Sequence, residues 1–176
     1  KSSVRFQVTH DVYTSSSRNT IYSGDAHAVF QLHPGLLAVI LSDGMGNNIE
    51  AHRESRRVMQ FMRECLNKKM DPETTMHTLH YMMSLHDETD SYATVDLALI
   101  DLQKGELWSW KAGSMSTYLI RGKDMRKIES KHVPFGFLPT ISIEARKVDI
   151  KDGDILLMLS DGVFSSKTTI EKQEQY

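Results

Sequence analysis

The chain has 176 residues, with 21 Lys and Arg against 23 Asp and Glu, and a formal net charge of −2. That length is sufficient for one domain with a hydrophobic core, and the scattered basic residues argue against a nucleic-acid-binding surface. No apolar run approaches the ~20 residues that a membrane-spanning helix needs, so we expect no membrane contact by this chain. The single cysteine, Cys65, cannot form an internal disulfide, which favours a reducing compartment such as the cytoplasm. The chain opens on Lys1 and stops at Tyr176 in a polar stretch, and we expect it to be a piece of a longer protein.

The first third of the chain has the pattern of β-structure. Residues 4–10 alternate apolar and polar side chains, which predicts a half-buried strand. Residues 28–32 and 36–41 are joined by the turn signal His33-Pro34-Gly35, which predicts a hairpin. The run at 36–41 is continuously apolar, as in a strand buried on both faces.

Two helices are predicted next, over residues 48–69 and 72–86. In the first, apolar side chains recur at helical spacing on one stripe. The second begins with Asp71-Pro72, a typical N-cap followed by the first helical residue.

The remainder again favours strands, at about 93–100, 107–111, 117–121, 125–128, 143–150 and 155–159. We find no repeat and no domain boundary. Strands in meander order around two helices predict an α+β sandwich of stacked sheets, with the helices covering an outer face.

Three carboxylates stand at predicted strand ends. Asp43 follows the apolar run 36–41 in Ser42-Asp43-Gly44, and Asp161 follows the run 155–159 in Ser160-Asp161-Gly162. In an antiparallel hairpin Asp25 would lie beside Asp43. Two buried strands could therefore present their acidic ends to one cleft.

Buried carboxylates must be paired, protonated or bound to metal, and no Lys or Arg adjoins Asp43 or Asp161 in sequence. We therefore predict a site for a hard divalent cation, with Gly44 leaving its backbone carbonyl accessible. The residues alone leave another interpretation open, because Asp-Gly after a strand is often a simple turn and Asp25 could cap its neighbours.

Other polar groups have simpler explanations. Asp152-Gly153-Asp154 lacks the further ligands of a calcium loop and predicts a hairpin turn. His77 and His80 share a helix face without carboxylate partners, and a solvated face explains them better than a zinc site.

The ordered set of these motifs resembles the PP2C (PPM) class of metal-dependent serine/threonine protein phosphatases, and within it the phosphatase domains of the stage II sporulation protein E group. The segments that carry the resemblance span about residues 4–164, and include Ser23-Gly24-Asp25, Ser42-Asp43-Gly44-Met45-Gly46-Asn47, residues 92–102, Lys111-Ala112-Gly113-Ser114, residues 133–136 and residues 159–164.

The resemblance implies an αββα sandwich, with the whole chain, 1–176, as one phosphatase domain that lacks its C-terminal part. It implies that Asp43 bridges two manganese or magnesium ions, that the Gly44 carbonyl binds one ion and Asp161 the other, and that Asp25 joins the site directly or through water. Asp43 and Asp161 would be the catalytic residues. The family's last metal-binding aspartate would lie beyond Tyr176, so this fragment alone would be inactive or bind metal poorly.

The resemblance also implies biology. The substrate would be a phosphorylated anti-anti-sigma factor, whose dephosphorylation activates a sporulation sigma factor in a bacterium. The helices at 48–69 and 72–86 would form a regulatory switch and contribute to a homodimer. The domain would be cytoplasmic, in a protein anchored to the membrane by a region absent from this chain. Two alternatives stay open, a catalytically silent binding module with the same fold and a stress-response phosphatase with a different anti-anti-sigma substrate.

Overall fold

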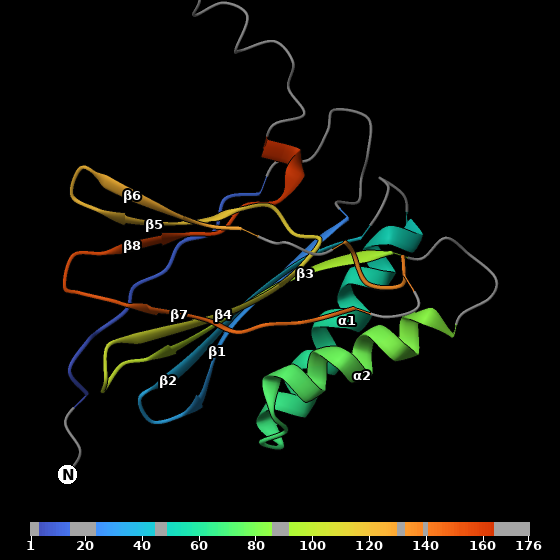
Figure 1. Cartoon of the computed structure of the whole chain (residues 1–176), viewed down its shortest axis with the longest axis horizontal. Helices are drawn as coiled ribbons and strands as arrows, with labels where there is room; N and C mark the ends of the chain where they lie inside the picture. The colour runs from blue at the N-terminus through green and yellow to red at the C-terminus, as the bar shows by residue number, and fades with distance from the viewer. Residues whose placement is uncertain are drawn as a thin grey trace, which may run out of the picture.

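Two antiparallel sheets packed face to face form the body of the protein in a computed structural model, which describes residues 4–14, 24–44, 49–85, 92–129, 133–138 and 141–163 (Figure 1). The larger sheet has the order β1-β2-β3-β4-β7, with β1 Asp25–His33, β2 Leu36–Gly44, β3 Ala93–Asp101, β4 Glu106–Ala112 and β7 Arg146–Asp149. The smaller has the order β6-β5-β8, with β5 Thr117–Arg121, β6 Asp124–Ile128 and β8 Ile155–Leu157. A short 3-10 helix, Asp161–Val163, follows β8.

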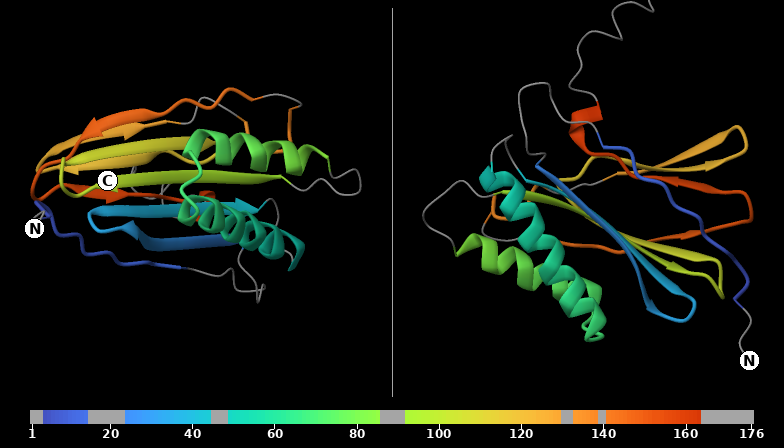
Figure 2. Two further views of the ribbon diagram at one scale, coloured as in Figure 1. Left: turned by 90° about the horizontal axis from the view of Figure 1, so that it is seen from below. Right: turned by 180° about the vertical axis from the view of Figure 1, so that it is seen from behind.

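Two helices cover the outer face of the five-stranded sheet (Figure 2). They are α1, Ile49–Asn67, and α2, Pro72–Ser84. The predicted N-cap is confirmed at α2, where the Asp71 side chain accepts a hydrogen bond from the Thr74 N–H at 2.9 Å. Among the described residues, neither helix combines the length and apolar character needed to cross a membrane.

The central strands β2 and β3 contribute to two separate cores. On one face, Ala38, Ile40, Val95 and Leu97 pack against the helices in the larger core. On the other face, Ala98 and Ile100 of β3 meet Leu119 and Ile128 of the smaller sheet. This double burial explains why β2 and β3 are nearly continuous apolar runs in the sequence.

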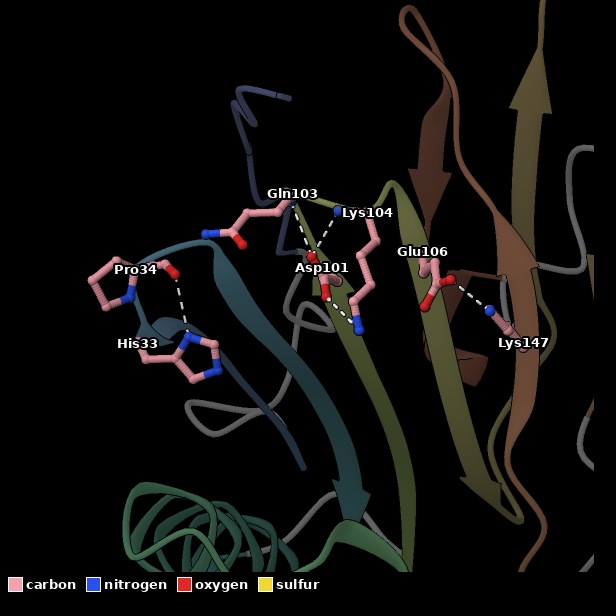
Figure 3. Close-up of polar contacts among 7 residues, drawn as sticks. All are labelled: His33, Pro34, Asp101, Gln103, Lys104, Glu106 and Lys147. Atoms are coloured by element: carbon pink, nitrogen blue, oxygen red, sulfur yellow. Dashed lines mark hydrogen bonds and ion pairs between the residues drawn. The ribbon is translucent and has the colours of Figure 1, made fainter. Parts of the chain in front are cut away.

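The hairpin turns gather at one end of the five-stranded sheet (Figure 3). Asp101 Oδ1 accepts hydrogen bonds from the backbone N–H groups of Gln103 and Lys104, at 3.0 and 2.9 Å, and so closes the β3–β4 turn. Lys147 of β7 donates to Glu106 of β4 at 2.6 Å. These contacts fix the register of the sheet at its turn end, and β2 and β1 present Asp43 and Asp25 at its other end.

The structure confirms the α+β sandwich and most of the predicted elements, but one predicted strand does not form and two are shorter than predicted. One of these, predicted over 143–150, is limited to Arg146–Asp149. Residues 4–10 form no strand, because their backbone reaches the sheet only through Arg5 and Phe6, whose N–H groups donate to the Leu102 carbonyl. The last strand, predicted over 155–159 as buried, ends at Leu157 and exposes 59% of Ile155.

The described residues supply three of the four layers in the predicted αββα arrangement. Within them, no helix covers the outer face of the three-stranded sheet, and Met125, Ile155 and Leu157 are exposed. Because this face is uncovered, Ile155 and Leu157 of β8 are exposed although the sequence predicted a buried strand.

Candidate metal centre

The β1–β2 hairpin brings Asp25 and Asp43 together. The register pairs Asp25 with Asp43 directly, and the Gly44 N–H donates to the Gly24 carbonyl at 3.1 Å. Directly opposed residues project their side chains from the same face of a sheet. The adjacency predicted from the hairpin is therefore confirmed, and both side chains are half-buried.

Asp43 is also fixed from its other side. The Thr94 hydroxyl of β3 accepts a hydrogen bond from the Asp43 N–H at 3.1 Å, and the register pairs Asp43 with Thr94. Alternation along β2 puts Asp43 on the same face as Leu37 and Val39, which pack in the core between the two sheets. The Asp43 carboxylate thus faces the three-stranded sheet.

Asp161 reaches this site from the three-stranded sheet. It is exposed and begins the 3-10 helix after β8. The neighbouring Ser160 hydroxyl donates to Asp25 Oδ2 at 2.9 Å, which ties the chain after β8 to the start of β1. Segments from the two sheets therefore meet at the carboxylates.

The ionisation of Asp43 is governed by burial and by the two neighbouring carboxylates. Burial, followed by the negative charges of Asp25 and Asp161, raises the pKa of Asp43 from 3.8 to about 8. No cationic side chain is among the groups that shift this pKa. A cation would relieve this repulsion and let Asp43 ionise, as expected where a metal ion belongs.

The donor set suits a hard divalent cation that keeps part of its water shell. Carboxylate and carbonyl oxygens are the preferred ligands of Mg²⁺ and Mn²⁺. In the part of the chain that the structure describes, however, no three His, Cys, Asp or Glu side chains are close enough to enclose an ion by themselves. The described carboxylates therefore do not enclose an ion by themselves, and a hard cation beside Asp43 would keep water in much of its coordination shell.

Gly44 is a position that only glycine fits. It is buried, and a Cβ atom placed there would lie 2.3 Å from the Ala51 carbonyl oxygen in the first turn of α1. The beginning of α1 therefore rests directly on the backbone beside Asp43. Met45, Gly46 and Asn47, which complete the sequence motif, lie outside the described residues, as do Ser23 and Phe164 of the other motifs.

The expectation of a solvated face for the two helix histidines was wrong for His80. His77 is exposed, but His80 is buried, with its ring 5.7 Å from that of Phe135. The Gly136 N–H lies 3.5 Å from His80 Nδ1. The helical periodicity placed His80 beside buried Met76 and Met83, a signal that its face was the packed one.

Sequence reasoning also missed a buried polar cluster of Asp96, Lys111 and Thr117. Asp96 lies two residues after Thr94 and shares its face of β3. A signal was present, because one acidic and one basic residue interrupt two apolar strands that are neighbours in the sheet. Opposite charges in adjoining buried strands indicate an ion pair.

Comparisons with known proteins agree with this fold. Residues 33–176 match the family described as "Stage II sporulation protein E (SpoIIE)". The chain is 30% identical over 154 residues to stage II sporulation protein E of Bacillus subtilis (strain 168), covering 88% of this chain but 19% of that protein. The chain thus spans about a fifth of the length of that curated relative.

Solved structures share the architecture. The PP2C phosphatase domain of SpoIIE from Bacillus subtilis, solved with a fragment of its regulatory domain, is 32% identical with a TM-score of 0.74, over 80% of this chain and 42% of that one. RsbX, solved in complex with magnesium, has a TM-score of 0.72 at 14% identity, over 85% of this chain and 72% of that one, and shares the fold alone.

Proposed function

Because the chain belongs to the stage II sporulation protein E (SpoIIE) family and has the PP2C-like fold, we propose that it is part of a metal-dependent phosphatase domain that removes phosphate from serine or threonine. Residues 1–176 form a portion of this one domain. The observation that carries the proposal is the meeting of three carboxylates from both sheets. Asp43 pairs with Asp25 in the β1–β2 hairpin, Ser160 beside Asp161 binds Asp25, and no base is among the groups that shift the pKa of Asp43.

Asp43 and Asp161 are the proposed catalytic residues. They would hold Mn²⁺ or Mg²⁺ together with the Gly44 carbonyl and with Asp25. When bound, such ions polarise a phosphoryl oxygen and lower the pKa of a water molecule. The chain's own contribution is orientation, because Thr94 fixes the Asp43 backbone and Ser160 holds Asp25.

The proposed substrate is a phosphorylated anti-anti-sigma factor, and the proposed outcome is activation of a sporulation sigma factor. Support comes from the identity to the Bacillus subtilis relative, which carries sporulation in its name. The proposed setting is a cytoplasmic domain of a larger, membrane-anchored bacterial protein.

We propose that α1 and α2 act as a regulatory switch and contribute to a homodimer. Support for the switch is the contact between the first turn of α1 and Gly44, since a shift of α1 would be felt at the backbone that carries Asp43. Support for an interface is the exposure of Tyr81 on α2 and of Leu85 directly after it.

The test uses the full-length protein and a phosphorylated anti-anti-sigma factor, with phosphate release measured with and without Mn²⁺. We expect Mn²⁺-dependent release, lost in Asp43→Asn and in Asp161→Asn and kept in Asp152→Asn, an exposed turn carboxylate that serves as the control. All variants should keep the circular dichroism spectrum of the wild type.

The same assay separates the alternatives. A silent binding module would bind the phosphorylated partner and release no phosphate under any metal condition. A stress-response phosphatase would prefer another anti-anti-sigma factor in a substrate panel. Equal release by wild type and Asp43→Asn would contradict the proposed site.

A further inference from the structure

A buried ion pair lies between the two sheets. Lys111 of β4 donates through Nζ to Asp96 Oδ2 of β3 and, at 2.8 Å, to the Thr117 hydroxyl of β5. That hydroxyl in turn donates to the same Asp96 oxygen. Among the ion pairs of the described residues, this one alone has both side chains almost fully buried.

This polar cluster is a poor source of stability. Burial raises the pKa of Asp96 and lowers the pKa of Lys111, so each charge is disfavoured where it lies. Asp96 Oδ1 is also buried without a hydrogen-bond partner among the described residues. Desolvation of such a pair commonly cancels the attraction between its charges, and its better-attested contribution is to specify one arrangement of the packed elements.

The position of the polar cluster suggests which arrangement it specifies. The chain passes from the larger sheet to the smaller between Ala112, the end of β4, and Thr117, the start of β5. The cluster joins both sides of this crossover to Asp96. It therefore determines how the two sheets meet at this crossover.

The carboxylates of the candidate metal centre lie near the same crossover. On β3, Asp96 shares its face with Thr94 two residues earlier, and Thr94 holds the Asp43 N–H. On the smaller sheet, Tyr118 follows Thr117 directly and pairs with Leu157 at the end of β8, four residues before Asp161. The cluster thus joins β3 and β5, which pair with the two strands that lead to Asp43 and Asp161, β2 and β8.

We infer that Asp96, Lys111 and Thr117 form a positioning cluster, which sets the spacing of the two sheets where Asp43 and Asp161 meet and so determines the affinity of the site for a divalent cation. The divalent cation in this inference rests on the proposed function, whereas the arrangement of the cluster is independent of it. None of the three residues is assigned a contact with metal or substrate.

A second inter-sheet contact provides a matched control. Arg121, at the other end of β5, donates to both oxygens of Asp154 at 2.8 and 2.7 Å and to the Asp149 carbonyl of β7 at 3.0 Å. This contact also joins the two sheets, but at the end away from Asp43. Its loss should weaken packing without altering the metal site.

The experiment compares Thr117→Val, Thr117→Ser and the double variant Asp96→Leu/Lys111→Met with Asp154→Asn in the full-length protein. Thr117→Val keeps the shape of the side chain and removes its hydroxyl. The double variant removes both charges together, so that neither is left buried without its partner. Mn²⁺ affinity is measured by calorimetric titration, and folding by urea unfolding in EDTA.

We expect Thr117→Val and the double variant to weaken Mn²⁺ binding by about 10-fold or more, the loss typical of removing a group that orients metal ligands. Thr117→Ser should restore the affinity to near that of the wild type. Asp154→Asn should lower the urea midpoint and leave the Mn²⁺ affinity unchanged.

Hydrogen exchange at the backbone amides of residues 155–162, without metal, supplies a second readout. It should speed up in Thr117→Val and not in Thr117→Ser. Unchanged Mn²⁺ affinity in Thr117→Val, or an equal loss in Asp154→Asn, would overturn the inference. A wild-type protein that binds no Mn²⁺ would instead overturn the proposed function, and the exchange data would then decide the positioning role alone.

Discussion

Replacing Asp43 by asparagine should stabilise the protein when divalent cations are absent. In the folded chain the Asp43 carboxyl keeps its proton up to about pH 8, because burial and the charges of Asp25 and Asp161 oppose ionisation. In the unfolded chain the same group ionises near its ordinary pKa of 3.8. The folded state therefore loses stability relative to the unfolded state as pH rises from about 4 to about 8, and the loss is absent below the lower value. An asparagine side chain at this position has no such proton to lose, so the variant escapes this loss.

The size of the effect follows from the pKa shift and the exposure of the site. A rise from 3.8 to about 8 corresponds to an upper limit of roughly 6 kcal/mol in the free energy of unfolding, at 1.36 kcal/mol per pKa unit. Asp43 is only half-buried, and solvent screens its neighbours, so we expect about 2 kcal/mol.

Urea unfolding in EDTA, at intervals from pH 4.5 to pH 8.5, measures this difference. The gain of Asp43→Asn over the wild type should grow with pH and level off near pH 8, while Asp152→Asn should follow the wild type throughout. Adding Mn²⁺ should reverse the order, because an ion bound by the folded state stabilises the wild type more. Parallel pH profiles for Asp43→Asn and the wild type would refute the reasoning.

Three further substitutions test the surroundings of the site and the fold. Gly44→Ala should lower the melting temperature and weaken Mn²⁺ binding, at a cost of about 2 kcal/mol or more, because its Cβ would lie 2.3 Å from the Ala51 carbonyl oxygen; an unchanged melting temperature would show that α1 yields easily. Phe135→Ala should reduce the free energy of unfolding in urea by about 3–5 kcal/mol, since the ring is fully buried; a loss under about 1 kcal/mol would contradict this packing. Asp71→Ala should cost about 1 kcal/mol in the same assay, because the N-cap bond to Thr74 is lost, and Asp71→Asn should restore most of it.

The fold was largely predictable from local pattern. The hairpin of β1 and β2 follows from one turn signal between two apolar runs, and its register placed Asp25 beside Asp43. The same reasoning failed for residues 4–10, because alternation shows that a segment could be a strand but not that a partner strand is available. It also overstated the burial of β8, since an apolar run does not reveal which face another layer will cover.

The site was predictable in its acidic residues but not in what holds them. Asp43 and Asp161 were identifiable as acidic ends of apolar runs, whereas the proximity of Asp161 depends on how two sheets dock. The contact between Thr94 and the Asp43 backbone and the cluster around Asp96 arise between strands distant in sequence. In the sequence, such contacts are indicated only by a charged residue within an apolar strand.

The bond between Ser160 and Asp25 joins residues 135 positions apart. On a ribosome, the hairpin that carries Asp25 and Asp43 emerges long before the segment that carries Ser160 and Asp161. A nascent chain therefore holds two mutually repelling acids and lacks the third. The acidic triad closes only after β8 has been synthesised and docked, so among the described residues its closure is a late step of folding rather than an early one.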